Sequence, residues 1–297
     1  MTARLARVDD NLESADRLLE RAFSLGCEMV ILPEFFTSAV AFHRDMLEVA
    51  GPLDGPALSM MLTTAKRHGA YVGGSFLASR GGDVFNTFVL AFPDGRYATH
   101  DKDQPTMWEN CYYVGGNDDG VLDTPIGPVG AALCWELVRA RTARRLEGKV
   151  DLLVGGSCWW GMPDRAIPIP GKGSAGHRNM AIMKDTPVRM ARMLGVPVVH
   201  AAHASGFECR MPLLPGFPYR SHFLGETMVV DSTGEVLSRL SREDGEGLAV
   251  AEVQPGRTDP VEDIPERFWI PRLPLLIRMV WFYQNFHGRL YYRLMNR

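Results

Sequence analysis

The chain has 297 residues, of which 46% are hydrophobic and 23% are charged, and its formal net charge is -3. This composition is typical of a globular protein with a sizeable core, and the charge gives no general attraction for nucleic acid. Five scattered cysteines without CxxC or Cys/His metal spacing favour a reducing cytoplasm over a disulfide framework. Because the first residues lack an apolar run and no segment has the length of a membrane span, we expect neither a signal peptide nor a transmembrane helix.

The first hundred residues predict helices that alternate with strands. Asp10 or Asn11 can cap a first helix, whose apolar residues recur at helical spacing, and Gly26 follows as a stop signal. Pro56 can open a second helix that Gly69 closes. The predicted elements are a helix at 10–25, a strand at 29–32, a helix at 56–68, a strand at 71–76, and strands at 84–92 and 96–100 that a turn at 93–95 joins.

The same alternation continues through the second half of the chain. A Gly- and Pro-rich stretch, 159–176, interrupts it and is expected to be an irregular binding loop. Helices that alternate with strands and hairpins predict an α/β fold with a mixed sheet. The predicted elements are a strand at 129–133, an Arg-rich helix at 137–146, a strand at 151–154, a helix at 182–194, a strand at 196–201, a hairpin at 227–240 and a strand at 248–253.

The last stretch, 262–297, differs from the domain at 1–261 in composition. From Arg267 to Arg297 it holds six arginines, no acidic residue and many apolar and aromatic side chains. We expect this basic, aromatic tail to pack on the domain or on a partner subunit. The alternative is an interfacial helix on anionic lipid. We disfavour a membrane partner because Pro271 and Pro274 break any long helix.

Three reactive residues follow predicted strands: Glu34 after 29–32, Lys102 after 96–100, and Cys134 after 129–133. Separate strand ends that converge on one point are a common way to assemble a catalytic site. Cysteine is the nucleophile of the three, glutamate can take its proton, and lysine can stabilise the charge that develops on a substrate.

Each of the three also has a structural interpretation. A buried cysteine is usually inert, a loop glutamate is usually solvated, and a lysine between Asp101 and Asp103 is usually part of a surface cluster. Against this, Phe35 follows Glu34 and predicts an apolar pocket that raises the pKa of that carboxyl. A strand that turns into a helix at Cys134 would lower the thiol pKa and supply oxyanion donors.

These segments resemble the nitrilase superfamily of carbon-nitrogen hydrolases over residues 11–253. The order and gaps of Glu34, Lys102 and Cys134 match its Glu-Lys-Cys triad. Glu109 stands where the family places a second glutamate, which helps to position the substrate or the lysine. The matching motifs are Val30-Ile31-Leu32-Pro33-Glu34-Phe35, Lys102-Asp103-Gln104-Pro105-Thr106-Met107-Trp108-Glu109 and Cys134-Trp135-Glu136.

The resemblance implies an αββα sandwich, with mixed sheets and helices on the outer faces, that assembles into a homodimer or a larger homo-oligomer. It implies no metal or organic cofactor. The implied substrate is a small-molecule nitrile or amide, which Cys134 would convert to a thioester. The Pro-Thr and Trp-Glu pairs favour a nitrilase. An amidase or carbamoylase could use the same triad, and a non-catalytic binding or assembly module is a third reading.

The chain departs from the family pattern at two places. The family opens with a strand ahead of the first helix, whereas here the first predicted helix follows almost directly after Met1. We expect that strand to be absent or very short. Leu137 follows the Cys134 motif, where the nitrilase branch usually continues with Asn or His, and this weakens the assignment to nitriles.

Other side chains have weaker claims on the site. Trp135, Trp159 and Trp160 are candidates for the substrate pocket, although core packing accounts for them equally well. His200 and His203 flank the end of a predicted strand, and without a third ligand nearby we expect a structural role. A basic run is expected to form a solvated helix face, and it consists of Arg139, Arg141, Arg144 and Arg145.

Overall fold

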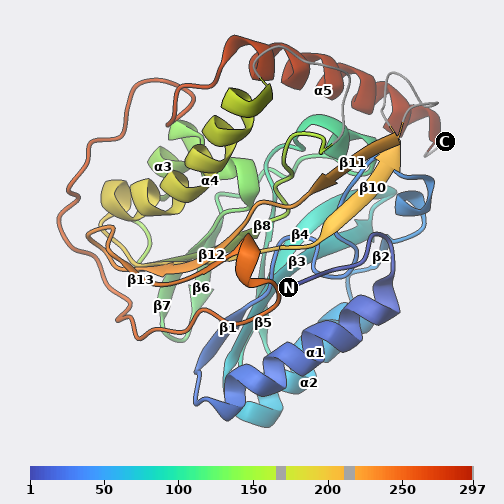
Figure 1. The fold of residues 1–297 in the computed structure, drawn as a ribbon. Helices are drawn as coiled ribbons and strands as arrows, with labels where there is room; N and C mark the ends of the chain where they lie inside the picture. The colour runs from blue at the N-terminus through green and yellow to red at the C-terminus, as the bar shows by residue number, and fades with distance from the viewer. Residues whose placement is uncertain (165–171, 211–217, 296–297) are drawn as a thin grey trace.

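The computed structural model describes residues 1–164, 172–210 and 218–295, which stack in four layers as helices, sheet, sheet and helices (Figure 1). This is the αββα sandwich that the resemblance implies. Apolar side chains fill the space between the two sheets, among them Phe88 and Leu90 from the first sheet and Val129 and Val154 from the second. The alternation of helices and strands in the sequence therefore predicted the fold class correctly.

Among the described residues, the first sheet has five strands in the order β1-β3-β4-β5, with β2 paired to β3. The strands β1 and β3 run parallel, whereas β3, β4 and β5 pair antiparallel. The apolar faces of α1 (Val8–Ser24) and α2 (Pro56–His68) pack against this sheet. The strands are β1 (Met29–Ile31), β2 (Gly51–Pro52), β3 (Tyr71–Arg80), β4 (Asp83–Ala91) and β5 (Tyr97–Asp101).

The second sheet has six strands among the described residues, in the order β13-β12-β9-β8-β7-β6. The central strands β7, β8 and β9 run parallel, and α3 (Ala140–Leu146) and α4 (Lys172–Leu194) pack on their outer face. The strands are β6 (Val121–Thr124), β7 (Gly127–Ala131), β8 (Leu152–Ser157), β9 (Val198–Ala202), β12 (Gly225–Val230) and β13 (Val236–Ser241).

Shorter elements complete the described chain. Strands β10 (Gly206–Arg210) and β11 (Pro218–His222) form an antiparallel hairpin. Single 3-10 turns occur at η1 (Arg44–Leu47), η2 (Met107–Cys111), η3 (Cys134–Glu136) and η4 (Arg242–Asp244). A C-terminal helix, α5 (Leu275–Met295), lies along the outer rim near η2 (Figure 1).

The N-terminal helix does not use the predicted cap. It begins at Val8, and its N-cap residue, Arg7, makes no side-chain capping bond. The Asn11 side chain instead donates to the Arg4 and Thr37 backbone oxygens, at 2.7 and 2.9 Å, and accepts from the Arg4 N–H. The Asn11 side chain is therefore a buried link between the segments of Arg4 and Thr37, and it does not act as a helix cap.

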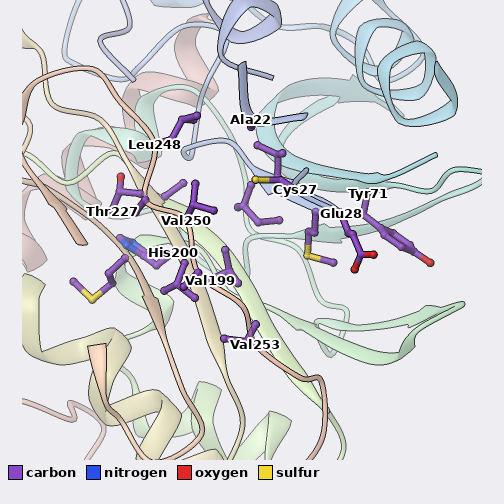
Figure 2. A pocket seen from close by; sticks show the side chains of 18 of the residues that line it. Ala22, Cys27, Glu28, Tyr71, Val199, His200, Thr227, Leu248, Val250 and Val253 are labelled. Atoms are coloured by element: carbon purple, nitrogen blue, oxygen red, sulfur yellow. The ribbon is translucent and has the colours of Figure 1, made fainter. Parts of the chain in front are cut away.

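The strand predicted at 248–253 is absent, because these residues have no hydrogen-bonded partner strand within the described chain. Residues 1–7 likewise form no strand, as the departure from the family pattern predicted. Residues 247–255 and β1 instead border a cavity of about 710 Å³ (Figure 2). Its walls are largely aliphatic, and they include Val199, Val250 and Val253.

Two further elements differ from the sequence-based expectation. Helix α4 begins at Lys172 rather than near Ile182, so the expected irregular loop is shorter at its C-terminal end, while residues 165–171 lie outside the described chain. Strand β7 ends at Ala131, and Cys134 is the first residue of the three-residue turn η3.

The predicted helix-breaking effect of Pro274 is confined to the start of the tail. Helix α5 begins at the next residue, Leu275, and continues for 21 residues. It is fastened to the domain, since Tyr292 Oη accepts from the Val84 N–H and donates to Asp83, both at 3.0 Å. Among the described residues, no helix combines the length and apolar character needed to cross a bilayer.

Candidate active site

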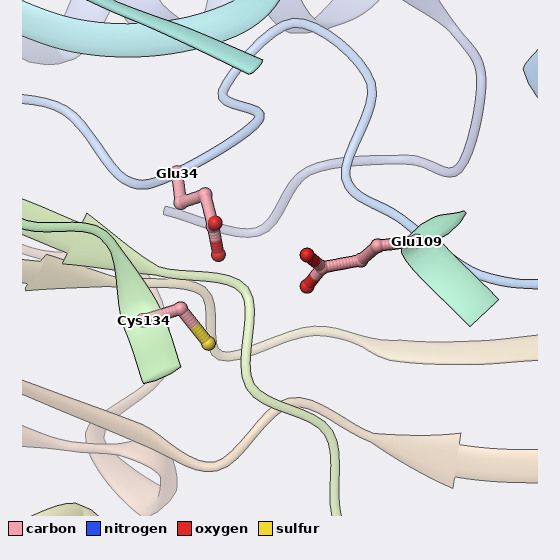
Figure 3. A group of neighbouring side chains, drawn as sticks. All are labelled: Glu34, Glu109 and Cys134. Atoms are coloured by element: carbon pink, nitrogen blue, oxygen red, sulfur yellow. The ribbon is translucent and has the colours of Figure 1, made fainter. Parts of the chain in front are cut away.

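The three reactive residues that the sequence singled out meet at one buried point. Glu34 follows β1, Lys102 follows β5, and Cys134 follows β7. One side-chain atom from each of Glu34, Glu109 and Cys134 lies within 4.8 Å of the others (Figure 3). Glu34, Lys102 and Glu109 have no exposed surface, and Cys134 is also buried. The tertiary structure thus assembles the four residues into one cluster.

Lys102 joins the two carboxylates. Its Nζ donates to Glu34 Oε1 at 2.8 Å and to Glu109 Oε2 at 2.7 Å. Burial by itself lowers the pKa of this amine, but the charges of Glu109 and Glu34 outweigh it and hold the pKa of Lys102 well above its ordinary value. The lysine is therefore an ammonium group fixed between two acids, and the interpretation as surface charge is wrong.

Glu34 is held by groups from several parts of the fold. Its Oε1 accepts from Asn86 Nδ2 at 2.9 Å, and its Oε2 accepts from the Cys158 N–H at 2.9 Å. Burial raises the pKa of Glu34 to about 7, with Lys102 opposing that rise and Glu109 adding to it. The predicted rise is confirmed, and it gives Glu34 a pKa suited to a general base near neutral pH.

The pKa of the Cys134 thiol is shifted in the direction opposite to the prediction. Burial, followed by the Glu34 charge, raises the pKa of Cys134 well above its ordinary value, and Lys102 only partly opposes the rise. The predicted lowering by a helix N-terminus is wrong, because η3 has only three residues and desolvation dominates. The resting group is a neutral thiol that needs a base.

Backbone strain gathers around the cluster. Cys134, Phe35 and Met107 have positive φ values of 50°, 52° and 54°, which non-glycine residues rarely adopt. Phe35 follows Glu34, and Met107 lies between Lys102 and Glu109 in the chain. Such strained positions persist where the surrounding structure enforces them, commonly at functional sites.

Glu109 is fixed by contacts within its own segment of the chain. Its Oε2 accepts from the Thr106 N–H at 3.0 Å, which closes a capping box around η2, and it also accepts from the Tyr113 hydroxyl. Sequence reasoning missed Tyr113 and Asn86 as parts of the site. Tyr113 is only four residues from Glu109, whereas nothing near Asn86 in the sequence marks it, because β4 brings it to Glu34.

A second buried charge network joins the lysine and cysteine segments. Glu136 accepts from His100 Nε2 at 3.0 Å, from Arg145 at 3.3 Å and from the Leu133 N–H at 2.9 Å. Burial opposes protonation of His100, but Glu136 and then Asp118 raise its pKa to about 10. This network anchors both ends of the loop that carries Cys134 to the segment that carries Lys102.

The basic run that extends along α3 from its N-cap residue, Arg139, is only partly a solvated face. Arg139 is 1% exposed, and it donates to Asp103 and to the Gln104 backbone oxygen. Arg145 bonds to Glu136 from a half-buried position, whereas Arg141 and Arg144 are exposed. The prediction is therefore wrong for two of the four arginines, because tertiary contacts with the lysine segment take them out of water.

The three predicted pocket tryptophans all pack at the apolar cluster around Cys134. Trp135 and Trp159 share an apolar cluster with Cys134, and their ring centroids are 5.6 Å apart. Trp269 and Trp281 from the C-terminal tail pack on Trp135 at 5.6 and 6.4 Å, and sequence reasoning did not link them to the site. Trp160 packs against the same cluster and also stacks on Trp108 at 4.3 Å.

The two histidines near β9 have structural contacts. His200 Nε2 bonds to Ser157 Oγ at 2.8 Å and its Nδ1 to the Glu226 backbone oxygen at 3.0 Å. His203 Nε2 bonds to the Glu34 backbone oxygen at 2.8 Å, so it steadies the chain beside the cluster. Burial lowers the pKa of His200 to about 4 and that of His203 to about 3, which leaves both rings neutral.

Glu34, Glu109 and Cys134 have the spacing of a metal site. The Lys102 ammonium, however, already donates to both carboxylates. A cation placed there would meet this fixed positive charge, so the cluster does not fit a metal. The arrangement instead suits proton transfer to and from a thiol.

Comparison with known proteins agrees with this geometry. The family model described as carbon-nitrogen hydrolase matches residues 1–263. The chain belongs to the carbon-nitrogen hydrolase family.

Curated relatives of the chain include two kinds of enzyme. Nitrilase 1 of Arabidopsis thaliana is 29% identical over 148 residues, covering 42% of each chain. Omega-amidase NIT2 of Danio rerio is 32% identical over 148 residues, covering 46% of this chain and 52% of that protein. The chain thus spans about half, or less, of the length of the curated relatives that it matches. These likenesses alone do not distinguish a nitrile substrate from an amide substrate.

Solved structures support the fold of the chain. A carbon-nitrogen hydrolase from Helicobacter pylori G27 has a TM-score of 0.70 at 19% identity, with coverage of 86% of this chain and 87% of that one. Nit3 of Saccharomyces cerevisiae has a TM-score of 0.65 at 18% identity, with coverage of 86% and 87%. The family match ends at residue 263, so α5 lies outside it.

Proposed function

We propose that the chain is a thiol hydrolase that cleaves a non-peptide carbon-nitrogen bond, with a nitrile as the favoured substrate. One observation carries the proposal: a buried ammonium, Lys102, is fixed between Glu34 and Glu109 beside the Cys134 thiol. A neutral thiol needs a base within reach, and a carboxyl with a pKa near 7 is matched to that task.

The chemistry can be written with Glu34 and Cys134 alone as proton carriers. Glu34 accepts the thiol proton as the sulfur adds to the nitrile carbon, and that proton passes to the nitrogen to give a thioimidate. Glu34 then activates a water molecule that adds to this carbon, and ammonia leaves, so a thioester remains. A second water molecule hydrolyses the thioester to the carboxylic acid and returns the proton to Cys134.

Lys102 supplies positive charge near the reacting carbon. As the sulfur adds, negative charge develops on the substrate nitrogen, or on the oxygen of an amide. The Lys102 ammonium stabilises it together with backbone N–H groups near Cys134 and Trp135. Glu109 acts as a positioning residue, because its contact with Lys102 holds the ammonium in place.

The substrate side chain is expected to be aliphatic or aromatic. The cluster around Cys134 consists of apolar groups, including Trp135, Trp159, Met183 and Leu224. Among the described residues, the ammonium beside the thiol is that of Lys102, which is already bonded to two carboxylates. A substrate with its own carboxylate would therefore lose hydration without gaining a partner there.

An amidase or carbamoylase is the second candidate. An amide reaches the same thioester when the thiolate attacks its carbonyl carbon and ammonia leaves. The relation to Omega-amidase NIT2 supports this reading, as Nitrilase 1 supports the first. The motif around Pro105, Thr106 and Trp135 is the reason for preferring the nitrile.

Ammonia release tests both candidates. The purified chain is assayed with aliphatic and aromatic nitriles, the matching primary amides and N-carbamoyl compounds. Cys134→Ala is expected to remove turnover, whereas Cys209→Ala, which changes a buried cysteine in β10, is expected to retain it. Rapid turnover of amides with inert nitriles would contradict the nitrile preference. A folded chain that releases no ammonia from any class would contradict the hydrolase proposal.

A further inference from the structure

The inner face of helix α5 packs against the domain. Its buried residues are Trp281, Asn285, Gly288 and Tyr292. The Asn285 side-chain oxygen accepts from the Met107 N–H at 2.7 Å, so this face contacts the turn that carries Glu109. These contacts fix the rotation of the helix about its axis, and they therefore determine which of its side chains point outward.

The outer face of α5 is a continuous apolar stripe. Its residues recur every three or four positions, which places them on one side of a helix. Each has more than half of its surface exposed. Because these residues are neighbours on one face, they form a patch rather than a set of isolated surface side chains. The stripe consists of Leu275 (70% exposed), Met279 (61%), Phe282 (61%), Phe286 (73%), Leu290 (52%) and Leu294 (63%).

Positive charge borders the stripe along one edge. At 100° per residue, Arg278 and Arg289 lie beside the apolar positions, whereas Arg293 falls within the stripe near its C-terminal end, and all three are exposed. No salt bridge involves them within the described chain, although Arg289 donates to the Asn110 side chain at 3.4 Å. Because residues 267–297 contain no acid, the whole segment has one sign of charge.

We propose that α5 binds an anionic lipid surface. The helix would lie in the plane of the interface, with Phe282 and Phe286 among the acyl chains and the arginines at the headgroups. The prolines that argued against a membrane partner lie ahead of the helix and do not interrupt it.

A second copy of the chain is the less favourable occupant. An antiparallel contact between two α5 stripes brings two arginine edges together without an acid in either segment. That repulsion is absent on a surface of negative phospholipids, where the same arginines contribute to binding.

Vesicle sedimentation tests the proposal. The purified chain is mixed with phosphatidylcholine vesicles that contain either no phosphatidylglycerol or 30% of it. Binding is expected only to the anionic vesicles, with a tenfold or greater loss for Phe286→Glu. The matched control is Val261→Glu, which adds the same charge at a 61% exposed apolar position outside α5.

The charge contribution is tested separately. Arg278→Gln with Arg293→Gln is expected to weaken binding about fivefold per arginine. Circular dichroism and thermal unfolding establish that each variant is folded. Absence of binding to anionic vesicles, or equal binding by Phe286→Glu, would overturn the proposal. So would a concentration-dependent dimer that Phe286→Glu abolishes, if vesicles are not bound.

Discussion

The Nζ atom of Lys102 lies 2.8 Å from Oε1 of Glu34, and neither side chain has any exposed surface. This pair alone would hold Glu34 as a carboxylate, because an adjacent ammonium lowers the pKa of an acid. Burial and the second acid, Glu109, reverse that effect and raise the pKa of Glu34 to about 7. The balance of these three influences makes Glu34 a base that can exchange a proton with a thiol near neutral pH.

The activity is expected to fall on the acidic side of neutrality. Glu34 must be unprotonated to accept the Cys134 proton, and its pKa is raised to about 7. Below that pH, kcat/KM for hydrolysis should fall about tenfold per pH unit. A pH profile between 5 and 8 measures this limb, and a rate that stays constant from pH 7 down to pH 5 would contradict the role of Glu34.

Replacing Glu109 by Gln is expected to move that limb to lower pH. The Glu109 charge raises the pKa of Glu34, so its removal lets Lys102 lower that pKa. We expect kcat to fall by about tenfold to a thousandfold, because the ammonium loses one of its two carboxylates. A purely structural role for Glu109 would reduce the amount of folded enzyme and leave the acidic limb at its original pH.

Loss of Arg139 is expected to destabilise the fold strongly. Its removal leaves the Asp103 carboxylate buried without its main partner. Arg139→Met should lower the free energy of unfolding by about 3–5 kcal/mol. Arg141→Met, at an exposed position two residues further on in α3, should change it by less than about 0.5 kcal/mol. Urea unfolding compares the two, and equal effects would show that Arg139 is not a buried ion-pair partner.

His100 is expected to make stability depend on pH above neutrality. Its pKa is raised in the folded chain to about 10, from an ordinary value of 6.5. The folded chain therefore binds more protons than the unfolded chain between these values. This contribution is complete below pH 6.5 and is lost as the pH rises through 10. The loss amounts to at most about 1.4 kcal/mol per pH unit.

Comparison with His100→Gln isolates this contribution. The variant should be less stable at pH 6, and its free energy of unfolding should fall less than that of the wild type between pH 6.5 and 9. Chemical unfolding at several pH values measures both. Parallel curves for the two proteins would contradict a protonated His100 between Glu136 and Asp118.

Two helical glycines are expected to respond in opposite ways to alanine. A Cβ at Gly288 would lie 3.0 Å from the Asn110 backbone carbon and 2.5 Å from its Cβ, whereas one at Gly176 meets no atom within 4 Å. Gly288→Ala should lower stability by about 1–3 kcal/mol through overpacking. Gly176→Ala should raise it by about 0.5–1 kcal/mol, because alanine is the better helix former. Thermal unfolding distinguishes them, and a stabilising Gly288→Ala would contradict the close seating of α5.

The sequence predicted best what depends on local pattern. Strand ends followed by Glu34, Lys102 and Cys134 indicated the cluster, and family motifs around them added Glu109. It failed where a contact crosses the fold. Nothing in the sequence marked Asn86, which β4 brings to Glu34, and Arg139 belongs to a basic run until Asp103 pairs with it.

The alternation of helix and strand, and the identity of three reactive residues, were therefore determined by the sequence, because periodicity and motif spacing are local properties of the chain. Only the tertiary structure decided the protonation of Cys134 and the extent to which the pKa of Glu34 rises. Desolvation raises the pKa of Cys134 and outweighs any lowering by the turn that begins at this residue. The pKa of Glu34 depends on the charges of Lys102 and Glu109, which lie in another part of the chain. It also decided which face of α5 meets the domain, because both faces carry aromatic side chains and the seating of Asn285 and Gly288 against Asn110 selects one.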